Sequence, residues 1–546
     1  MKRVLKYVVV LAAGLMATAC SEDYLNTVPS YAVSDGLLQE DVANYAGVIN
    51  GISHLMVAQQ GNYGQGYCGL STVQIRLGDL CGNDAISQAV QGFNSANMAL
   101  CNSNSAAYGG YSWWFFYNVI GNANRILDTI DDAEGDDKLR ALYKAQALTY
   151  RAFAYTYLVQ IFSKRWMDSS NGSTPGVVLR TEASTDAMPR ASLAECYAQI
   201  YQDCDEAISL FGQSGQSVSE FYLPSLNMAW GVKARAALAR EDWDTAATAA
   251  RNARAGHPLM SQDDFMDGFC YANDEWIYGG VGRSDENKWY YSFGNYHAYN
   301  GYYSIKYGYS TVASRELVDA FNDTDVRKQL FLHQNLFDIP FTYTVDGKGT
   351  LGTYARVNTA TREGVALGNA MLDYIFDNPT LGGYCELTGA YPSVPSAYGQ
   401  LKFAVFDLPG VSNQCFMRAA EMYLTEAEAL CKKASADEAG ARALLNELNG
   451  ARDNGYTATS ASGQALIDEI MLTRRMELWG EGHAWFDLKR TGQPIVRKLY
   501  SNKAADGTID GTFHPSWYTY VGPNDAGSND WVWTIPLDET EYNDQI

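Results

Sequence analysis

The stretch from Asp137 to Phe162 reads DKLRALYKAQALTYRAFAYTYLVQIF and contains neither Gly nor Pro. Its apolar residues recur at steps of three and four, which predicts a single helix of roughly 40 Å at about 1.5 Å per residue. Two apolar stripes follow it, one through Leu142, Ala145, Leu148, Ala152, Tyr155, Val159 and Phe162, the other through Ala147, Ala154, Leu158 and Ile161. The polar edge at Lys144, Gln146 and Arg151 is narrow, so other helices must cover most sides of this helix. We therefore expect a core helix that packs and does no chemistry.

Further helices are predicted on both sides of this core helix. Residues 40–59 and 111–130 precede it. After it, Ser192 and Glu195 form a capping box, and Gly212 is expected to end the helix that they begin. Two hairpins with small residues at their contacts follow, 224–240 with 243–255 and 416–431 with 437–452. Hairpins from both ends of the sequence are expected to stack into one scaffold.

Between residues 255 and 414 the helical signal fades, and Gly and Tyr become frequent. Tyr303, Tyr307 and Tyr309 alternate as in a strand with one buried face. Only residues 314–322 are predicted to be helical in this region. We expect long loops and short strands on a rigid helical frame, which is where binding sites usually lie.

The chain begins with a basic segment, an apolar run from Tyr7 to Met16 and three small residues before Cys20. This pattern predicts a secretory signal peptide, which is too short to span a membrane. It resembles a bacterial lipobox, in which Cys20 becomes the lipidated first residue, although Ala17 stands where that pattern prefers Leu. The alternative is an ordinary cleaved signal with an incidental cysteine. No later apolar run reaches the roughly 20 residues of a transmembrane helix, so membrane attachment would depend on lipid at Cys20.

The composition excludes nucleic acid as a partner. Lys and Arg number 40 against 62 Asp and Glu, and the formal net charge of -22 repels polyanions. Apart from Cys20, nine cysteines are scattered without CxxC spacing and are predicted to be thiols. The chain also carries 38 Tyr and 12 Trp, more than core packing usually needs, so some of these rings are expected to face a ligand or partner.

No motif indicates catalysis. Gly64, Gly66 and Gly69 spell GxGxxG, but no strand precedes them and no βαβ unit surrounds them. The sequence contains no HExxH, GxSxG, Walker loop or EF-hand series, and its six histidines are spread out. The protein is therefore predicted not to be an enzyme and to need no cofactor. A Ca²⁺ ion in an Asp-rich loop stays open.

The helical segments, in their order, resemble the SusD/RagB family of outer-membrane nutrient-binding lipoproteins of Bacteroidetes. The segments that carry the resemblance are NRILDTI at 124–130, LTYRAFAYTYLVQIF at 148–162, residues 190–208 and 224–255, RAAEMYLTEAEAL at 418–430, RRMELWGEGHAWFDLKR at 474–490 and TIPLDETEYND at 534–544. Thr473 and Ala484 depart from the residues common in the family, Glu and Arg, which puts a salt bridge in doubt. The short acidic stretch after Cys20 resembles the surface-export tag of Bacteroidetes lipoproteins.

The stretch from 283 to 310, RSDENKWYYSFGNYHAYNGYYSIKYGYS, is the main candidate binding loop. Sugars offer C–H faces to aromatic rings and hydroxyls to Asn, Asp, Arg and Tyr, and this loop supplies both kinds of partner. The candidate ligand contacts are Trp289, Tyr290, Tyr291, Tyr296 and Tyr299. The alternative is that these rings pack the loop itself, which we favour for Tyr303, Tyr307 and Tyr309.

A second candidate loop, from Gly61 to Asn83, follows the first predicted helix. Its candidate ligand contacts are Tyr63, Tyr67, Arg76, Asp79, Asn83 and Asp84. The family resemblance implies that this region lines the binding face. The same resemblance places Trp113 and Trp114 in a packed helix, so we interpret both as core residues.

Together these features predict a mainly α-helical protein with tetratricopeptide-like hairpins. Residues 1–19 would be the signal peptide and 20–546 a single domain, with a helical scaffold at 40–255 and 414–490 and a loop-rich binding region at 256–413. The resemblance implies a lipid-anchored outer-membrane protein that faces outward, binds glycans and delivers them to a SusC-like TonB-dependent transporter. A peptide-binding member of the same family and a glycosidase are the alternatives.

Overall fold

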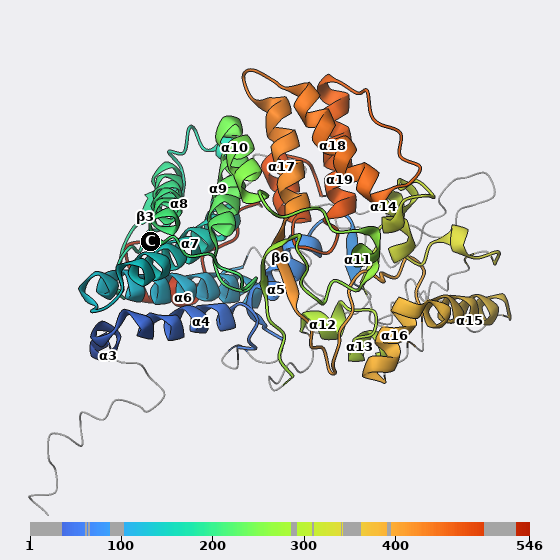
Figure 1. Cartoon of the computed structure of the whole chain (residues 1–546), viewed down its shortest axis with the longest axis horizontal. Coiled ribbons are helices and arrows are strands. Elements are labelled where there is room, and N and C mark those ends of the chain that lie inside the picture. The colour runs from blue at the N-terminus through green and yellow to red at the C-terminus, as the bar shows by residue number, and fades with distance from the viewer. Residues whose placement is uncertain are drawn as a thin grey trace, which may run out of the picture.

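The structure is a computed structural model that describes residues 35–60, 63, 66–87, 103–284, 292–307, 311–339, 341, 362–389, 392, 395–495 and 531–546. Helices dominate these residues and the strands are short (Figure 1), which confirms the predicted mainly helical fold class. Within the described residues, no helix is both long enough and apolar enough to cross a membrane. The cysteines of the described part are free thiols, as expected.

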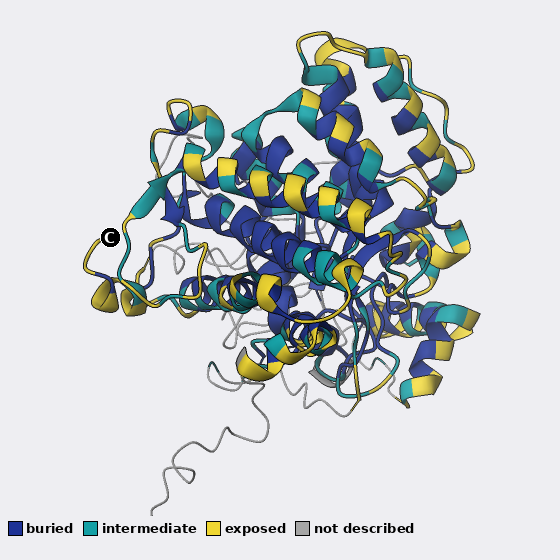
Figure 2. Ribbon diagram, turned by 60° about the vertical axis from the view of Figure 1, so that its left-hand side comes forward, coloured by how far each residue is buried: buried dark blue, intermediate teal, exposed yellow. Residues whose placement is uncertain are grey.

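The core helix α7 has the bounds that the sequence predicts, Asp137–Phe162. Its N-cap, Asp136, accepts a hydrogen bond from the Lys138 backbone N at 2.8 Å. From residue 145 onward every side chain except Gln160 is buried, and Figure 2 shows this ribbon in dark blue within the molecule. The helices packed against it are α4 (Tyr45–Leu55), α6 (Ala107–Thr129), α8 (Leu193–Ser214) and α9 (Leu226–Arg240).

The polar edge of α7 is narrower than the sequence suggests. Arg151 is buried, and its guanidinium donates to both carboxylate oxygens of Asp203 on α8, at 2.9 and 2.7 Å, and to Asn124 Oδ1 on α6 at 2.9 Å. Lys144 remains partly exposed and pairs with Asp131 at 2.8 Å. One buried arginine therefore joins three helices.

The capping box at the start of α8 is confirmed, because Ser192 accepts from the Glu195 backbone N and Glu195 accepts in return from the Ser192 backbone N. The expected stop at Gly212 is wrong. The helix runs through Gly212 to Ser214 and ends at Gly215, which has a φ of 61° and so takes the left-handed conformation that glycine allows without strain.

Hairpins from both ends of the sequence lie side by side, as predicted (Figure 1). The first pairs α9 with α10 (Trp243–Ala253), and the second pairs α17 (Ala419–Lys432) with α18 (Glu438–Arg452). Helix α10 packs on α17, and α19 (Gly463–Glu477) packs on α17 and α18. The small residues at the contact include Ala246, Ala247, Ala420 and Ala427.

Helix α17 begins three residues later than predicted, because residues 416–418 belong to strand β6 (Gln414–Arg418). This strand pairs antiparallel with β4 (Trp276–Gly280). Two other antiparallel pairs join β1 (Ala85–Ser87) to β5 (Thr311–Ala313) and β2 (Pro175–Val178) to β3 (Arg190–Ser192). The first predicted helix, 40–59, is also divided, into α3 (Asp35–Glu40), η1 (Val42–Asn44) and α4.

The loop-rich region contains more helix than the sequence suggests. Besides α14 (Arg315–Asp319), which falls within the expected stretch 314–322, it forms α15 (Arg362–Asp377) and α16 (Pro379–Thr388), and the expectation of a single helical stretch is wrong. Leu367, Met371 and Ile375 recur every four residues and bury one face of α15. The shorter elements are α11 (Gln262–Met266), α12 (Phe293–Tyr296), α13 (Tyr302–Tyr307), η7 (Val326–Leu330) and η8 (Gln334–Leu336).

A buried network of ion pairs joins the hairpin scaffold to this region. Arg418, the last residue of β6, binds Glu275 at 2.7 Å, Glu477 at 2.8 Å and Glu481 at 2.7 Å. The cations of the network are Arg327, Lys402, Arg418 and Arg452, and its carboxylates are Glu275, Asp325, Glu477 and Glu481. Each buried charge faces an opposite one, which offsets the cost of removing it from water.

Candidate functional site

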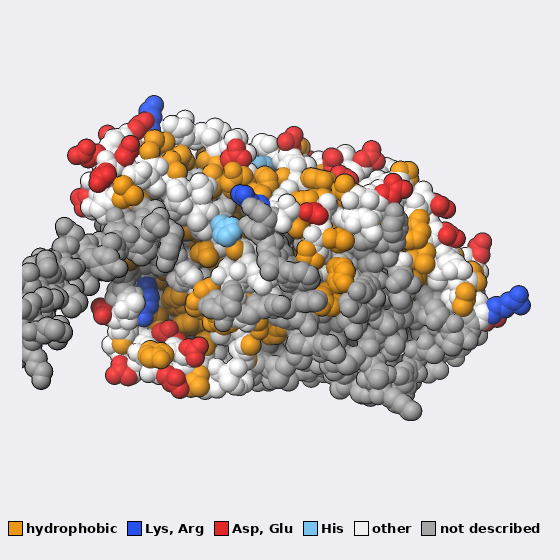
Figure 3. Space-filling view, turned by 90° about the horizontal axis from the view of Figure 1, so that it is seen from below, with side chains coloured by type: hydrophobic (Ala, Val, Ile, Leu, Met, Phe, Trp, Pro, Cys, Tyr) orange, Lys and Arg blue, Asp and Glu red, His pale blue; other side chains and the backbone are white. Residues whose placement is uncertain are grey.

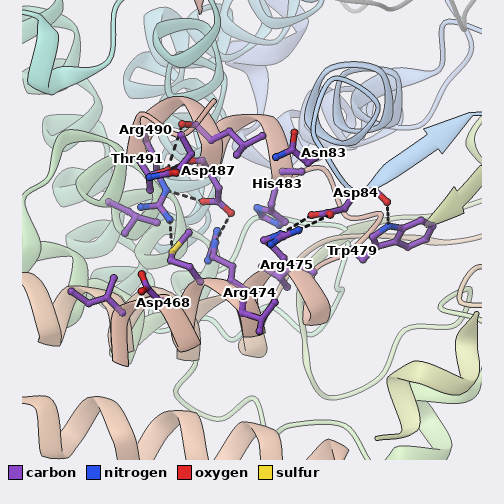
Figure 4. Close-up of a pocket in the computed structure, with 18 of the residues that line it drawn as sticks. Asn83, Asp84, Asp468, Arg474, Arg475, Trp479, His483, Asp487, Arg490 and Thr491 are labelled. Carbon is purple, nitrogen blue, oxygen red and sulfur yellow. Dashed lines mark hydrogen bonds and ion pairs between the residues drawn. The ribbon is translucent and has the colours of Figure 1, made fainter. Parts of the chain in front are cut away.

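A groove of about 980 Å³ runs beside α19 and α20 (Ala484–Thr491) (Figure 4). Three of the predicted ligand contacts, Asp79, Asn83 and Asp84, lie in its wall. Asp79 is the last residue of η2, a π-helix over Gln74–Asp79, and Asn83 and Asp84 lie in the segment that follows it. The groove is thus the place where the second candidate loop meets the C-terminal part of the scaffold.

Asp84 anchors this loop to α19. Arg475 donates to both carboxylate oxygens of Asp84, each at 2.8 Å, and Ser314 Oγ donates to one of them at 2.9 Å. The indole of Trp479 donates to the Asp84 backbone oxygen at 2.8 Å (Figure 4). The carboxylate predicted to contact a ligand is therefore already engaged on the protein side, while Asn83 beside it is half-buried on the groove wall.

Asp79 is 2% exposed and accepts a hydrogen bond from the Gly482 backbone N at 2.7 Å. Burial raises the pKa of its carboxyl well above the ordinary value. The contact needs a glycine at position 78, because a Cβ there would lie 2.3 Å from the Gly482 carbonyl oxygen. Arg76, another predicted contact, is also buried in η2. Both side chains are therefore almost entirely withdrawn from solvent.

Several charged side chains on the groove wall form ion pairs. Asp487 accepts from Arg474 at 2.7 Å and from Arg490 at 2.8 Å (Figure 4). Arg490 also donates to both carboxylate oxygens of Glu428, each at 2.7 Å. Burial opposes ionisation of Asp487, but the two arginines hold its pKa below the ordinary value. Apolar wall residues include Leu238, Trp243, Ile467, Met471, Leu472 and Leu478. Such a wall suits a neutral occupant better than an ionic one.

Tyr63 and Tyr67 belong to an aromatic cluster that also contains Tyr108, Tyr111 and Trp114. The ring of Tyr63 lies 5.7 Å from that of Tyr67, 5.3 Å from Tyr111 and 5.2 Å from Trp114. Tyr111 is buried and donates to the Gly69 oxygen at 2.9 Å, whereas Tyr63, Tyr67 and Trp114 are half-buried. Burial raises the pKa of Tyr63 to about 12, so its phenol is neutral at physiological pH. The cluster offers uncharged rings that are held in place by a buried one.

Trp113 and Trp114 were both predicted to be core residues, and this prediction is correct for Trp113 only. Trp113 is 4% exposed, meets the Phe162 ring edge-on at 4.9 Å and donates to Glu539 at 3.1 Å. Trp114 lies half-buried in the aromatic cluster instead of fully in the core. Neighbouring positions on α6 face different sides of the helix, so the two rings meet different surroundings.

The main candidate loop is described only in part. Trp289, Tyr290 and Tyr291 lie outside the described residues, and Tyr296 is placed only by its backbone, at the end of α12. Tyr299 is 4% exposed and donates its hydroxyl to the Leu381 oxygen at 2.8 Å, so its ring is part of the core and presents no face to a sugar.

The predicted strand in this loop is wrong. Tyr303 and Tyr307 lie in helix α13, and Tyr309 falls outside the described residues. Asn300 fixes the entrance to this helix, because its amide donates to the Val405 oxygen at 2.9 Å and its Oδ1 accepts from the Val405 backbone N at 2.8 Å. Tyr302 and Tyr303 remain half-buried, with their rings edge-to-face at 6.0 Å.

The described residues hold no cluster of three His, Cys, Asp or Glu side chains able to bind a metal ion. His297 is buried between Phe403 and Trp479, and burial, with help from Lys402 and Arg76, lowers its pKa to about 3. Its ring is therefore neutral at physiological pH.

The sequence did not predict a role for Arg475 or Trp479. Both contact Asp84, almost 400 positions away, and contacts over such a distance leave no local pattern in the sequence.

The stacked hairpins, the loops that they carry and the aromatic cluster define a tetratricopeptide-like scaffold with its candidate site on loops. A family model described as "SusD family" matches residues 409–546, and one described as "Starch-binding associating with outer membrane" matches residues 50–238. The chain belongs to the SusD/RagB family. No curated protein matches the chain.

Solved structures share this fold along nearly the whole chain. A SusD-like carbohydrate binding protein from Bacteroides vulgatus is 23% identical with a TM-score of 0.70, and the match covers 93% of this chain and 97% of that one. A SusD superfamily protein from Bacteroides thetaiotaomicron is 20% identical with a TM-score of 0.68, covering 93% and 99%. Surface glycan-binding protein A from Bacteroides uniformis is 15% identical with a TM-score of 0.63, covering 92% and 98%.

Proposed function

We propose that this protein binds glycans at the cell surface and delivers them to a SusC-like TonB-dependent transporter. The observation that carries the proposal is the cluster of partly exposed, uncharged rings formed by Tyr63, Tyr67 and Trp114. Aromatic faces bind the C–H faces of sugars and need no charge on the ligand. Family membership and the names of two structural relatives, a carbohydrate binding protein and a surface glycan-binding protein, support the same ligand class.

The charge of the protein favours neutral glycans over acidic ones. The formal net charge is -22, and the face in Figure 3 carries acidic side chains mostly along its outline, with hydrophobic ones gathered toward the middle. An acidic polysaccharide would be repelled at long range, whereas a neutral one would not. Binding needs no metal or cofactor in this proposal, and a Ca²⁺ ion beside the site remains compatible with it.

The proposed location is the outer face of the outer membrane, anchored by lipid on Cys20. The description of the model that matches residues 50–238 supports association with this membrane. Cys20 itself lies outside the described residues.

A peptide-binding role is the second candidate function, since the tetratricopeptide-like hairpins belong to a class of repeat that presents extended binding surfaces. Screening the protein on a glycan array and on a peptide library distinguishes glycan binding from peptide binding.

The experiment that tests the function is calorimetric titration of the purified protein with the strongest ligand from a glycan array. We expect binding that barely responds to salt, because stacking involves no net charge. Tyr67→Ala should weaken it about tenfold, because this ring belongs to the aromatic cluster that carries the proposal. Full affinity in a folded Tyr67→Ala protein would move the site to the other candidate loop, where Trp289→Ala is the variant to measure. New reducing ends after incubation with the glycan would favour a glycosidase instead.

A further inference from the structure

A cavity of about 80 Å³ lies next to Tyr271, between α11 and β4, and shares no lining residue with the groove. Its floor is formed by the buried side chains of Met260, Phe269 and Trp276. Its rim carries the exposed Asp264 and Asp267. This cavity lies outside both candidate binding loops and takes no part in the proposed function.

Tyr271 is a large ring that is both fixed and exposed. It is 48% exposed, yet it lies nearly parallel to Phe406, at 5.3 Å and 17°, and to Tyr384, at 6.4 Å and 28°. Tyr384 is pinned in turn, because its hydroxyl donates to Asp267 Oδ1 at 3.0 Å. A ring held by two others loses little freedom when a ligand covers it, which favours binding.

The backbone that leads to Tyr271 is unusual. Gly268 and Phe269 have φ values of 67° and 47°, so two successive residues take the left-handed conformation. A Cβ at position 268 would lie 2.7 Å from that of Ala404, which explains the glycine. Phe269, a bulky residue in this conformation, is held there by its packing against Phe265 and Phe403. The turn directs residues 269–273 around the cavity.

Residues that line the cavity carry polar groups that match a hydroxyl. The indole Nε1 of Trp276 is buried and has no acceptor among the described residues. Asp264 uses Oδ2 for the cap of α11 and Asp267 uses Oδ1 for Tyr384, which leaves one oxygen of each carboxylate without a donor from the described residues. A hydroxyl donates and accepts, so it can serve both kinds of group. The carboxylates disfavour an anion, and the indole N–H disfavours a cation.

The volume of the cavity limits the size of the chemical group that can enter it. At about 30 Å³ per water molecule, the cavity holds two or three waters, which is too little for a sugar ring but enough for a hydroxyl or hydroxymethyl group. The ring would have to stay outside, where Tyr271 offers its exposed surface. We propose that Tyr271 and this cavity form a second sugar-binding subsite, which stacks one neutral hexose on Tyr271 and receives one of its hydroxyl groups. This inference rests on the proposed function, glycan binding, and adds a second point of contact.

The test is calorimetry with maltoheptaose, cellohexaose and xylohexaose, and with oligogalacturonate as the charged counterpart. For the neutral oligosaccharide that binds the wild type, Tyr271→Ala should weaken affinity about tenfold or remove one of two binding events. Tyr271→Phe keeps the ring and should bind as the wild type does. Tyr542→Ala removes a ring that is 87% exposed and lines none of the described cavities, and should also change nothing.

Asp267→Asn provides a second test of the subsite, in which no aromatic ring is removed. Its side-chain oxygen still accepts from Tyr384, but the charge is gone, so oligogalacturonate should bind more tightly than to the wild type. Unchanged neutral binding in Tyr271→Ala together with unchanged oligogalacturonate binding in Asp267→Asn would overturn the subsite and leave the proposed function standing. If no neutral glycan of the array binds the wild type, both the subsite and the proposed function are overturned.

Discussion

Arg418 and Glu477 form the central ion pair of the protein. Arg418 Nη1 donates to Glu477 Oε1 at 2.8 Å, and Nη2 donates to the Glu477 backbone oxygen at 2.9 Å. Both side chains are at most 1% exposed. The pair fastens the end of β6 to the end of α19, and Arg452 and Arg327 reach the same carboxylate at 3.1 and 3.0 Å.

Removing this carboxylate should destabilise the protein strongly. Glu477→Gln leaves three buried arginines with less negative charge around them, and breaking a buried pair typically costs about 3–5 kcal/mol. Urea unfolding measures the loss. Asp137→Asn is the control, because its pair with Arg140 is exposed and should contribute nothing measurable. A loss below about 1 kcal/mol for Glu477→Gln would show that the other carboxylates compensate fully.

Stability should fall in mild acid because of a buried histidine. Burial holds the pKa of His297 at about 3 in the folded protein, against an ordinary value of 6.5, so the unfolded chain binds the proton first. The stability that His297 contributes is complete above pH 6.5 and is lost as the pH falls toward 3. Melting temperatures measured between pH 7 and 4.5 should therefore fall less steeply for His297→Gln. Parallel curves for the two proteins in this range would contradict the prediction.

The close approach of Gly78 to Gly482 should not tolerate a side chain. Gly78→Ala places a Cβ 2.3 Å from a backbone oxygen, and overpacking of this kind costs typically about 1–3 kcal/mol. Gly51→Ala is a matched control within α4, where a Cβ meets nothing within 4 Å. Because Ala favours a helix over Gly, this change should raise stability by about 0.5–1 kcal/mol. Thermal unfolding of both variants measures the change in stability. Equal changes in the two variants would contradict the packing argument.

The adjacent tryptophans of α6 should have separate effects. Trp113→Ala removes a buried ring and should cost about 3–5 kcal/mol of stability. Trp114→Ala removes a half-buried ring of the aromatic cluster and should instead weaken glycan binding about tenfold with a smaller loss of stability. Calorimetry and thermal unfolding on both variants provide the two readings. If Trp114→Ala left glycan affinity unchanged, the cluster would be packing and not a ligand surface.

Cys20 should carry the lipid anchor. Cys20→Ala should release the protein from the membrane fraction, because the substitution removes the thiol that would carry the lipid. Metabolic labelling with a fatty acid analogue and fractionation of the cells give the result. An unlabelled wild type whose variant stays in the membrane fraction would reject the prediction.

Local patterns predicted the scaffold well. Helix α7 has the bounds of its Gly-free and Pro-free stretch, and the Ser192–Glu195 capping box starts α8 at the expected residue. These features involve neighbours within a few positions, so the sequence contains them directly. The end of α8 was harder, because Gly212 and Gly215 are equally acceptable stops until the packing around them is known.

The candidate site was harder to predict, because its contacts join distant parts of the chain. Asp84 is a polar loop residue in the sequence, yet its role depends on Arg475, 391 positions away. Similarly, Tyr299 belongs to a tyrosine-rich stretch that suggests a ligand surface, and only its hydrogen bond to Leu381 identifies it as a core residue. Composition located the loops but could not say which side of each ring faces the protein.

The buried ion network has a consequence for how the chain is made. Glu275 meets Arg418 at 2.7 Å and Arg452 at 3.1 Å, but both arginines are synthesised long after it. Arg418, the earlier of the two, lies 143 positions after Glu275, a distance that a ribosome takes roughly 7 to 29 s to translate. During that interval the emerging chain holds a carboxylate whose partners do not yet exist. The centre of the molecule can therefore close only after residue 481 has been made.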